Sequence, residues 1–138
     1  MKAVFINNHG DIDNLNWSEV ADPKTLTQNQ VLVKIEASSI NHLDIWVRKG
    51  VAGHALKMPF ILGSDGAGVI VEKGKNIKNY EIGDDIVIQP GIFNKIKTKS
   101  NKEHYSPNYK IIGESVNGVQ SEYFRCDVEN IYPMPKNI

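Results

Sequence analysis

Residues 61–74 read ILGSDGAGVIVEKG, and four of these positions are glycines: Gly63, Gly66, Gly68 and Gly74. Glycine at this density has three common uses: to cradle a phosphate, to frame a metal site, or to let backbone segments approach closely. Which of the three applies decides whether this stretch takes part in binding a nucleotide.

The spacing of these glycines excludes the two common phosphate-binding motifs. A dinucleotide fingerprint requires Gly-x-Gly-x-x-Gly between a strand and a helix, with an acidic residue about 20 positions later. Here two residues separate Gly63 from Gly66, and β-branched residues rather than a helical run follow Gly68. A P-loop ends in Gly-Lys-Ser/Thr, whereas Gly74 is followed by Lys-Asn. The stretch is therefore predicted to serve the fold.

The chain on both sides of this stretch has mostly the pattern of β-strands. In VLVKIEASSI (31–40) apolar residues alternate with a more polar set, which predicts a strand with one buried face. After Asn41 the period becomes helical in HLDIWVRKG (42–50), and Gly50 is predicted to end that helix. Further strands are predicted at 2–6, 67–74, 85–91 and 119–126, and a long polar loop at 92–110.

This pattern predicts one compact, mainly β (α+β) domain over residues 1–138, with one or two short helices. Long helices do not alternate with the strands, so the sequence does not predict a doubly wound nucleotide-binding sheet. There is no internal repeat and no low-complexity segment. The length and the 41% hydrophobic content suit a single globular domain with a real core.

Charge and targeting signals exclude several classes of partner. Sixteen basic residues balance sixteen acidic ones, so no overall field attracts nucleic acid or an anionic membrane. The lysine-rich stretch 94–102 has no interleaved aromatic residues and is predicted to be a solvated loop. No signal peptide or membrane-spanning run is present, and we expect a cytoplasmic protein. The single cysteine, Cys126, excludes an internal disulfide and is predicted to be an inert strand residue.

The whole chain resembles the N-terminal GroES-like catalytic domain of the medium-chain dehydrogenase/reductase superfamily, which includes alcohol dehydrogenases and quinone oxidoreductases. That family has a Gly-His-Glu-x-x-Gly-x-x-x-x-x-Gly stretch, and Gly63, Gly68 and Gly74 fall on its three glycines. The resemblance also covers MKAVFI, VLVKIEASSINHLDIWVRKG, YEIGDDIVIQPG and YPMPKNI, in family order. It implies a GroES-like, distorted β-barrel fold.

The resemblance also bears on zinc. The zinc enzymes of the family hold their catalytic metal with a Cys at the position of Asn41 and a His at the position of Ser64, and a relay hydroxyl lies at the position of Leu43. An amide and a hydroxyl are poor zinc ligands, so we expect no catalytic zinc. His42 with Asp65 is a much less favoured substitute pair. The four cysteines of the family's structural zinc lobe are absent from 92–110, so we expect no structural zinc either.

Members of the family that lack zinc resemble the quinone oxidoreductase and enoyl reductase branch. These enzymes transfer hydride from NADPH, or NADH, to a small carbonyl or quinone substrate. Asn41-x-x-Asp44 matches the Asn-x-x-Asp of that branch, which implies that Asn41 faces the nicotinamide and that Asp44 supports the site. From the residues alone, Asn41 is equally expected to cap the helix that follows it.

Four further residues are candidates for the site, and three of them also have a structural interpretation. His42 matches a position near the cofactor pyrophosphate, although a solvent-facing histidine is the more common state. Trp46, Ser64 and Asp65 are predicted to line a substrate pocket. An aromatic residue at the helical spacing that Trp46 has from Leu43 is, however, usually part of the core. Asp65 is either a buried carboxylate behind the site or the cap of a turn.

In the family a coenzyme domain with its own Gly-rich loop follows the position of Ile138, and dimers commonly form through it. We therefore expect the 138-residue chain alone to transfer no hydride, and any homo-oligomer to depend on that further domain. Two alternatives stay open: a non-catalytic GroES-like domain for binding or assembly, and a zinc alcohol dehydrogenase with substituted ligands.

Overall fold

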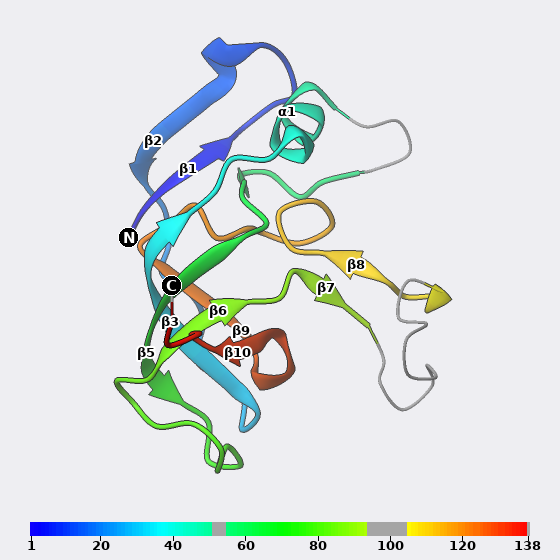
Figure 1. The fold of residues 1–138 in the computed structure, drawn as a ribbon. Helices are drawn as coiled ribbons and strands as arrows, with labels where there is room; N and C mark the ends of the chain where they lie inside the picture. The colour runs from blue at the N-terminus through cyan, green and yellow to red at the C-terminus, as the bar shows by residue number, and fades with distance from the viewer. Residues whose placement is uncertain (51–54, 94–104, 138) are drawn as a thin grey trace.

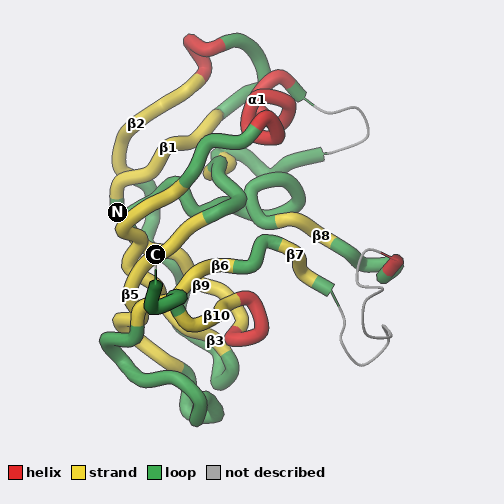
Figure 2. The backbone as a smooth tube through the Cα atoms, in the orientation of Figure 1, coloured by secondary structure: helices red, strands yellow, loops and turns green. Residues whose placement is uncertain are grey.

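A computed structural model describes residues 1–50, 55–93 and 105–137. Three antiparallel sheets make up most of the fold (Figures 1 and 2). The first has the strand order β2-β1-β4, the second β10-β6-β5-β3-β9, and the third is the β7–β8 ribbon, which projects from the rest of the domain. The strands are β1 (Lys2–Ile6), β2 (Leu15–Glu19), β3 (Gln30–Ser38), β4 (Phe60–Ile61), β5 (Gly66–Lys73), β6 (Asp85–Ile88), β7 (Gly91–Ile92), β8 (Lys110–Ile111), β9 (Tyr123–Asp127) and β10 (Ile131–Pro133).

The predicted mainly β architecture, a distorted barrel with one or two short helices, is confirmed: the described residues form curled antiparallel sheets and the α-helix α1. The helix α1 (His42–Lys49) begins after Asn41 and ends at Gly50, as the periodicity predicts. Gly50 has φ of 99°, which favours glycine, and its N–H donates to the last carbonyls of the helix. Two short 3₁₀ turns also occur, η1 (Ile12–Asn14) and η3 (Val128–Asn130).

The core lies on the buried face of the five-stranded sheet. In β3, Val31 and Val33 are fully buried while Lys34 is exposed, so the predicted alternation holds. A second cluster joins α1 to the three-stranded sheet, where Val47 packs with Ile6 and Leu62. Helix α1 is therefore anchored through one apolar face, which fixes where its N-terminus lies.

The glycines of residues 61–74 let backbone segments approach closely, as predicted. A Cβ on Gly68 would lie 2.0 Å from the Lys34 carbonyl oxygen, and one on Gly74 would lie 2.3 Å from the Gln28 carbonyl oxygen. Gly63 has φ of 95° and lies against Gln120. The stretch is thus the inner strand β5 and its entry turn, with no room for side chains at these contacts.

Several predicted boundaries are wrong, because long-range pairing rather than local pattern sets them. The strand predicted at 85–91 divides at Pro90 into β6 and β7. The strand predicted at 119–126 begins only at Tyr123. The short strands β2, β4, β8 and β10 were not predicted, since their runs are too short or too polar for a clear period. The lysine-rich stretch 94–102 and the centre of the predicted 92–110 loop lie outside the described residues, whereas the two ends of that loop, at Ile92 and Lys110, belong to the strands β7 and β8.

Across the described ranges, none of the helices combines the length and the apolar character that crossing a membrane requires.

Cys126 is buried in β9, as predicted, and we expect it to be unreactive in the folded protein. Burial raises the pKa of its thiol from 9.0 to about 12, so at pH 8 its thiolate fraction falls roughly 1000-fold. We expect a disulfide reagent at pH 8 to label the native chain at least about tenfold more slowly than the urea-unfolded chain, because the greater nucleophilicity of a thiolate with a higher pKa offsets only part of its lower abundance. The neutral thiol also contributes stability that is lost as pH rises above about 9. Equal labelling rates for the native and the unfolded chain would contradict the assignment of Cys126 as an unreactive, buried residue.

Candidate functional site

The candidate site forms where the end of β3, the start of α1 and the entry to β5 meet. Asn41 occupies the N-cap position of α1, as predicted, with extended backbone angles, and its backbone carbonyl accepts a hydrogen bond of 3.0 Å from the Asp44 N–H. Asp44, three residues later, completes a capping box: its Oδ2 accepts a hydrogen bond of 2.7 Å from the Asn41 backbone N–H. This pair fixes the first turn of the helix.

Asp44 also ties the helix to the glycine stretch. Its Oδ1 accepts a hydrogen bond of 2.9 Å from the Gly63 N–H, and the residue is only 5% exposed. Both carboxylate oxygens are therefore bound to backbone N–H groups. Such an arrangement supports the site by positioning its backbone, because these oxygens are already used as acceptors.

The side chain of Asn41 makes a hydrogen-bond network with two other residues. Its Nδ2 donates to Asp65 Oδ2 at 2.8 Å and to Ser39 Oγ at 3.3 Å. Ser39 Oγ donates in turn to the same Asp65 oxygen at 3.1 Å. Asp65 is exposed, so the expectation of a buried carboxylate is wrong. It lies at the surface because the entry turn to β5 directs it toward the end of β3.

Ser64, next to Asp65, is buried and has spare hydrogen-bonding capacity. It is 5% exposed, and its Oγ has no hydrogen-bond partner among the described residues. A buried hydroxyl left without a partner costs about 1–3 kcal/mol. Unsatisfied groups of this kind are rare and are often explained by a water or a ligand.

His42 and Trp46 form a separate aromatic pair on the solvent face of α1. Their ring centroids lie 4.8 Å apart, with the ring planes tilted by 42°. The interpretation of Trp46 as a core residue is wrong: it is 55% exposed, because Leu43 and Val47 occupy the face that packs on the sheet. The interpretation of His42 as solvent-facing is confirmed.

The residues at this site do not fit a zinc ion. The polar side chains gathered here are an amide, two hydroxyls and carboxylates, and Asp44 and Asp65 already accept hydrogen bonds from neighbouring groups. Zinc sites are built mainly from thiolate and imidazole ligands in tetrahedral geometry. Within the described ranges no group of three or more His, Cys, Asp or Glu residues is placed to hold a metal ion.

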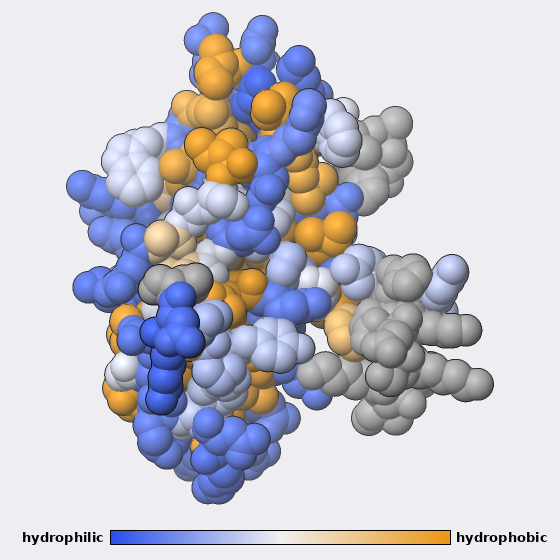
Figure 3. Space-filling view, viewed as in Figure 1, coloured by the Kyte–Doolittle hydropathy of each residue, from blue (hydrophilic) through white to orange (hydrophobic). Residues whose placement is uncertain are grey.

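An apolar cleft of about 710 Å³ lies beside the site. Figure 3 shows the apolar surface that gathers between β2 and α1. Of the predicted site residues only Asp44 lines the cleft, together with Ile40 and Ile45. Arg48, also in the lining, donates to the Gly10 carbonyl at 2.7 Å and so holds the loop before η1 against α1.

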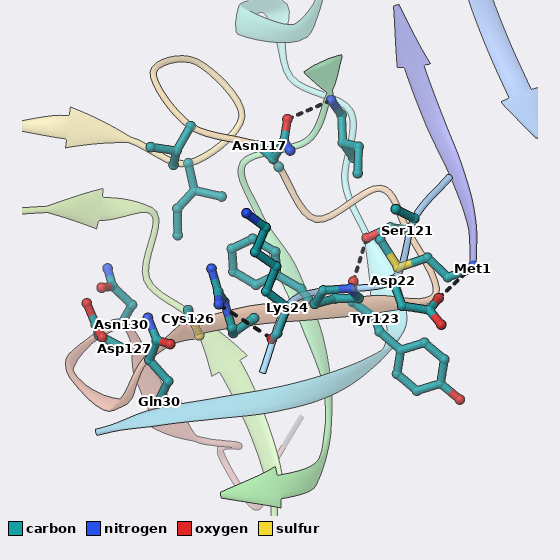
Figure 4. Close-up of a pocket in the computed structure, with 18 of the residues that line it drawn as sticks. Met1, Asp22, Lys24, Gln30, Asn117, Ser121, Tyr123, Cys126, Asp127 and Asn130 are labelled. Carbon is teal, nitrogen blue, oxygen red and sulfur yellow. Dashed lines mark hydrogen bonds and ion pairs between the residues drawn. The ribbon is translucent and has the colours of Figure 1, made fainter. Parts of the chain in front are cut away.

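A second cavity, of about 540 Å³, lies along β9 and contains none of the predicted site residues (Figure 4). Arg125 donates to the backbone carbonyls of Lys24 and Thr25, and the amino group of Met1 pairs with Asp22 at its edge. The side chain of Lys24 extends into the cavity. Of the two cavities, only the first is lined by a predicted site residue, Asp44, and neither is lined by Asn41.

The sequence did not single out Ser39, Gly63 as a hydrogen-bond donor, or Arg48. Ser39 is 26 residues from Asp65, and Gly63 is 19 residues from Asp44. The only available signal for Ser39 was its place two residues before the predicted N-cap, which does not identify a partner so far along the chain.

Comparisons with known proteins give consistent matches. The profile of the alcohol dehydrogenase GroES-like domain matches residues 27–136. An alcohol dehydrogenase of Geobacillus stearothermophilus is 31% identical over all of this chain and 41% of its own length. A mitochondrial NAD(P)H oxidoreductase of Dictyostelium discoideum is 41% identical over 62% of this chain and 26% of its own. A crystal structure of an NAD-dependent alcohol dehydrogenase superposes with a TM-score of 0.92 and 34% identity, covering 100% of this chain and 40% of that one.

The chain thus spans less than half of the length of the curated relatives it matches.

Proposed function

Because the chain belongs to the alcohol dehydrogenase GroES-like domain family, we propose that it is the substrate-side domain of a zinc-independent, NAD(P)H-dependent oxidoreductase. The reaction is of the quinone oxidoreductase or enoyl reductase type, with a small carbonyl or quinone as substrate. The similarity to dehydrogenases and to an NAD(P)H oxidoreductase supports the oxidoreductase part of this proposal.

One observation carries the zinc-independent part. At the position where the zinc enzymes of the family have a ligand, Asn41 has its amide nitrogen bonded to Asp65 at 2.8 Å. At the other such position, the Ser64 hydroxyl is buried and has no hydrogen-bond partner in the part of the chain that the structure describes. An amide already engaged with a carboxylate, and a neutral hydroxyl, offer little to a cation that prefers thiolate and imidazole.

In this proposal the residues of the chain orient the reactants. Bound NAD(P)H supplies the hydride. Asn41 faces the nicotinamide, and Asp44 holds Asn41 and the Gly63 turn at a fixed separation through its two hydrogen bonds. His42 lies exposed at the first turn of α1, where it is available to a phosphate group of the cofactor.

Steady-state kinetics of the natural polypeptide that contains this domain test the proposal. We expect oxidation of NADPH or NADH with a quinone or an enone, no zinc by elemental analysis, and full activity after treatment with a chelator. Asn41→Ala should lower kcat/KM by at least about tenfold through lost orientation of the cofactor.

Two controls accompany these kinetics. Asp85→Asn, an exposed change in β6, should leave the rate unaltered. The 138-residue chain alone should show no turnover. Stoichiometric zinc, with loss of activity on its removal, would contradict the proposal and favour the zinc alcohol dehydrogenase alternative.

A further inference from the structure

We propose that Asp65 is a positioning residue that locks the carboxamide of Asn41 in one of its two orientations, so that Asn41 offers a ligand only its oxygen. The lock depends only on the hydrogen bonds among Asn41, Asp65 and Ser39. The identity of the ligand that binds to Asn41 rests on the proposed function.

Both N–H donors of the Asn41 side chain are engaged in hydrogen bonds with Asp65 and Ser39. A carboxamide nitrogen has two N–H donors. One is directed to Asp65 Oδ2 at 2.8 Å, and the other reaches Ser39 Oγ at 3.3 Å. No N–H of this side chain is left for a ligand.

The charge of Asp65 enforces this orientation. An ionised carboxylate can only accept hydrogen bonds, so turning the Asn41 amide over would place its oxygen against a second acceptor. That arrangement replaces a charge-assisted hydrogen bond, which is stronger than one between neutral groups, with a repulsive contact. The orientation of the amide therefore follows from the chemistry of its neighbour.

The backbone holds Asp65 in the right place. The Ser39 backbone N–H donates to the Asp65 carbonyl at 3.2 Å, next to the pairing of Ser38 with Gly66 that joins β3 to β5. The carboxylate and its two partners therefore lie on segments that are already hydrogen-bonded to each other. Little conformational freedom remains to be lost when the network forms.

The lock sets the chemistry of the group that Asn41 can bind. A carboxamide oxygen has two lone pairs, with which it can accept hydrogen bonds from a ligand. Asp65 likewise has only acceptors. The ligand group at this position is therefore a hydrogen-bond donor, either an amide N–H₂ or a hydroxyl. The oxygen of a substrate carbonyl or quinone, itself an acceptor, is not bound by Asn41.

Nuclear magnetic resonance of the 138-residue protein tests the lock without any assay of activity. The side-chain N–H₂ signals of Asn41 report its orientation and its mobility. In the wild type we expect one pair of signals with an order parameter close to the rigid-backbone value of about 0.85. In Asp65→Asn the neighbour can both donate and accept, so the amide can turn over. We expect doubled signals or an order parameter below about 0.6.

Two matched variants separate positioning from a merely structural role. Ser39→Ala retains the Asp65 carboxylate and should preserve a single orientation of Asn41. Asp85→Asn makes the same chemical change at an exposed aspartate of β6 and should leave the Asn41 signals unchanged. Backbone amide signals of α1 and β5 should remain in place in every variant, since Asp44 rather than Asp65 holds the helix.

The outcomes are distinguishable. Mobile or doubled Asn41 signals in the wild type would overturn the lock, even if Asp65→Asn failed to fold. Unchanged Asn41 signals in a folded Asp65→Asn variant would also overturn it. Absence of NAD(P)H turnover in the natural polypeptide would instead remove the proposed function and leave the lock standing.

Discussion

Gly68→Ala is expected to cost about 4 kcal/mol or more, a large share of the roughly 5–15 kcal/mol by which a native domain is stable. The added Cβ would lie 2.0 Å from the Lys34 carbonyl oxygen and 3.0 Å from the Ile35 Cα, which are backbone atoms of β3. Backbone within a paired strand cannot move aside as a flexible side chain can. Relief would require β5 to separate from β3, at the centre of the five-stranded sheet.

Gly66→Ala is the matched control for this change. It lies in the same strand, two residues away, and its added Cβ would meet the Val119 side chain at 3.0 Å. A side chain can shift by a few tenths of an ångström, so we expect a cost of about 1–2 kcal/mol. Urea unfolding followed by circular dichroism measures both variants. Equal costs for the two would show that β3 can yield at Gly68 and that the close approach is not essential.

Asp44→Ala is expected to destabilise the protein by about 3 kcal/mol. The change removes the acceptor of two backbone N–H groups, those of Asn41 and Gly63, at a side chain that is only 5% exposed. Each buried donor left without a partner costs about 1–3 kcal/mol. Asp44→Asn retains one acceptor oxygen, but its new amide NH₂ group lies opposite the second backbone N–H. We therefore expect it to destabilise the protein by about half as much as Asp44→Ala.

The same urea experiment and amide hydrogen exchange check this prediction. The Gly63 amide should exchange faster in Asp44→Ala, because its hydrogen bond holds the turn before β5. Asp85→Ala, at an exposed strand position, should change the free energy of unfolding by less than about 0.5 kcal/mol. If Asp44→Ala cost no more than this control, water would have to replace the carboxylate at both N–H groups.

The two predictions share a physical basis. Gly68 allows β3 and β5 to lie close together, and Asp44 joins α1 to the turn that leads into β5. Together they bring Asn41 and Asp65 within hydrogen-bonding distance, although the two residues are 24 positions apart in the sequence. The stability of the fold and the geometry of the candidate site therefore depend on the same contacts.

The sequence by itself determined the elements whose signals are local. Alternation in 31–40 predicted β3, and the change of period after Asn41, with Gly50 at the end, predicted α1. The glycines of 61–74 predicted close backbone approach, because only glycine lacks the Cβ that would prevent it. Asn41 and Ser64 have side chains that are poor zinc ligands, so the sequence alone also predicted that no zinc is bound.

Only the tertiary structure decided the exposure and the partners of the site residues. Trp46 has the spacing of a core residue yet lies in solvent, because the sheet meets the other face of α1. Asp65 has no local feature that indicates Asn41 and Ser39 as its partners. Periodicity and propensity follow from the sterics of neighbouring residues, whereas hydrogen bonds across 20 or so positions depend on which strands pair and in which register.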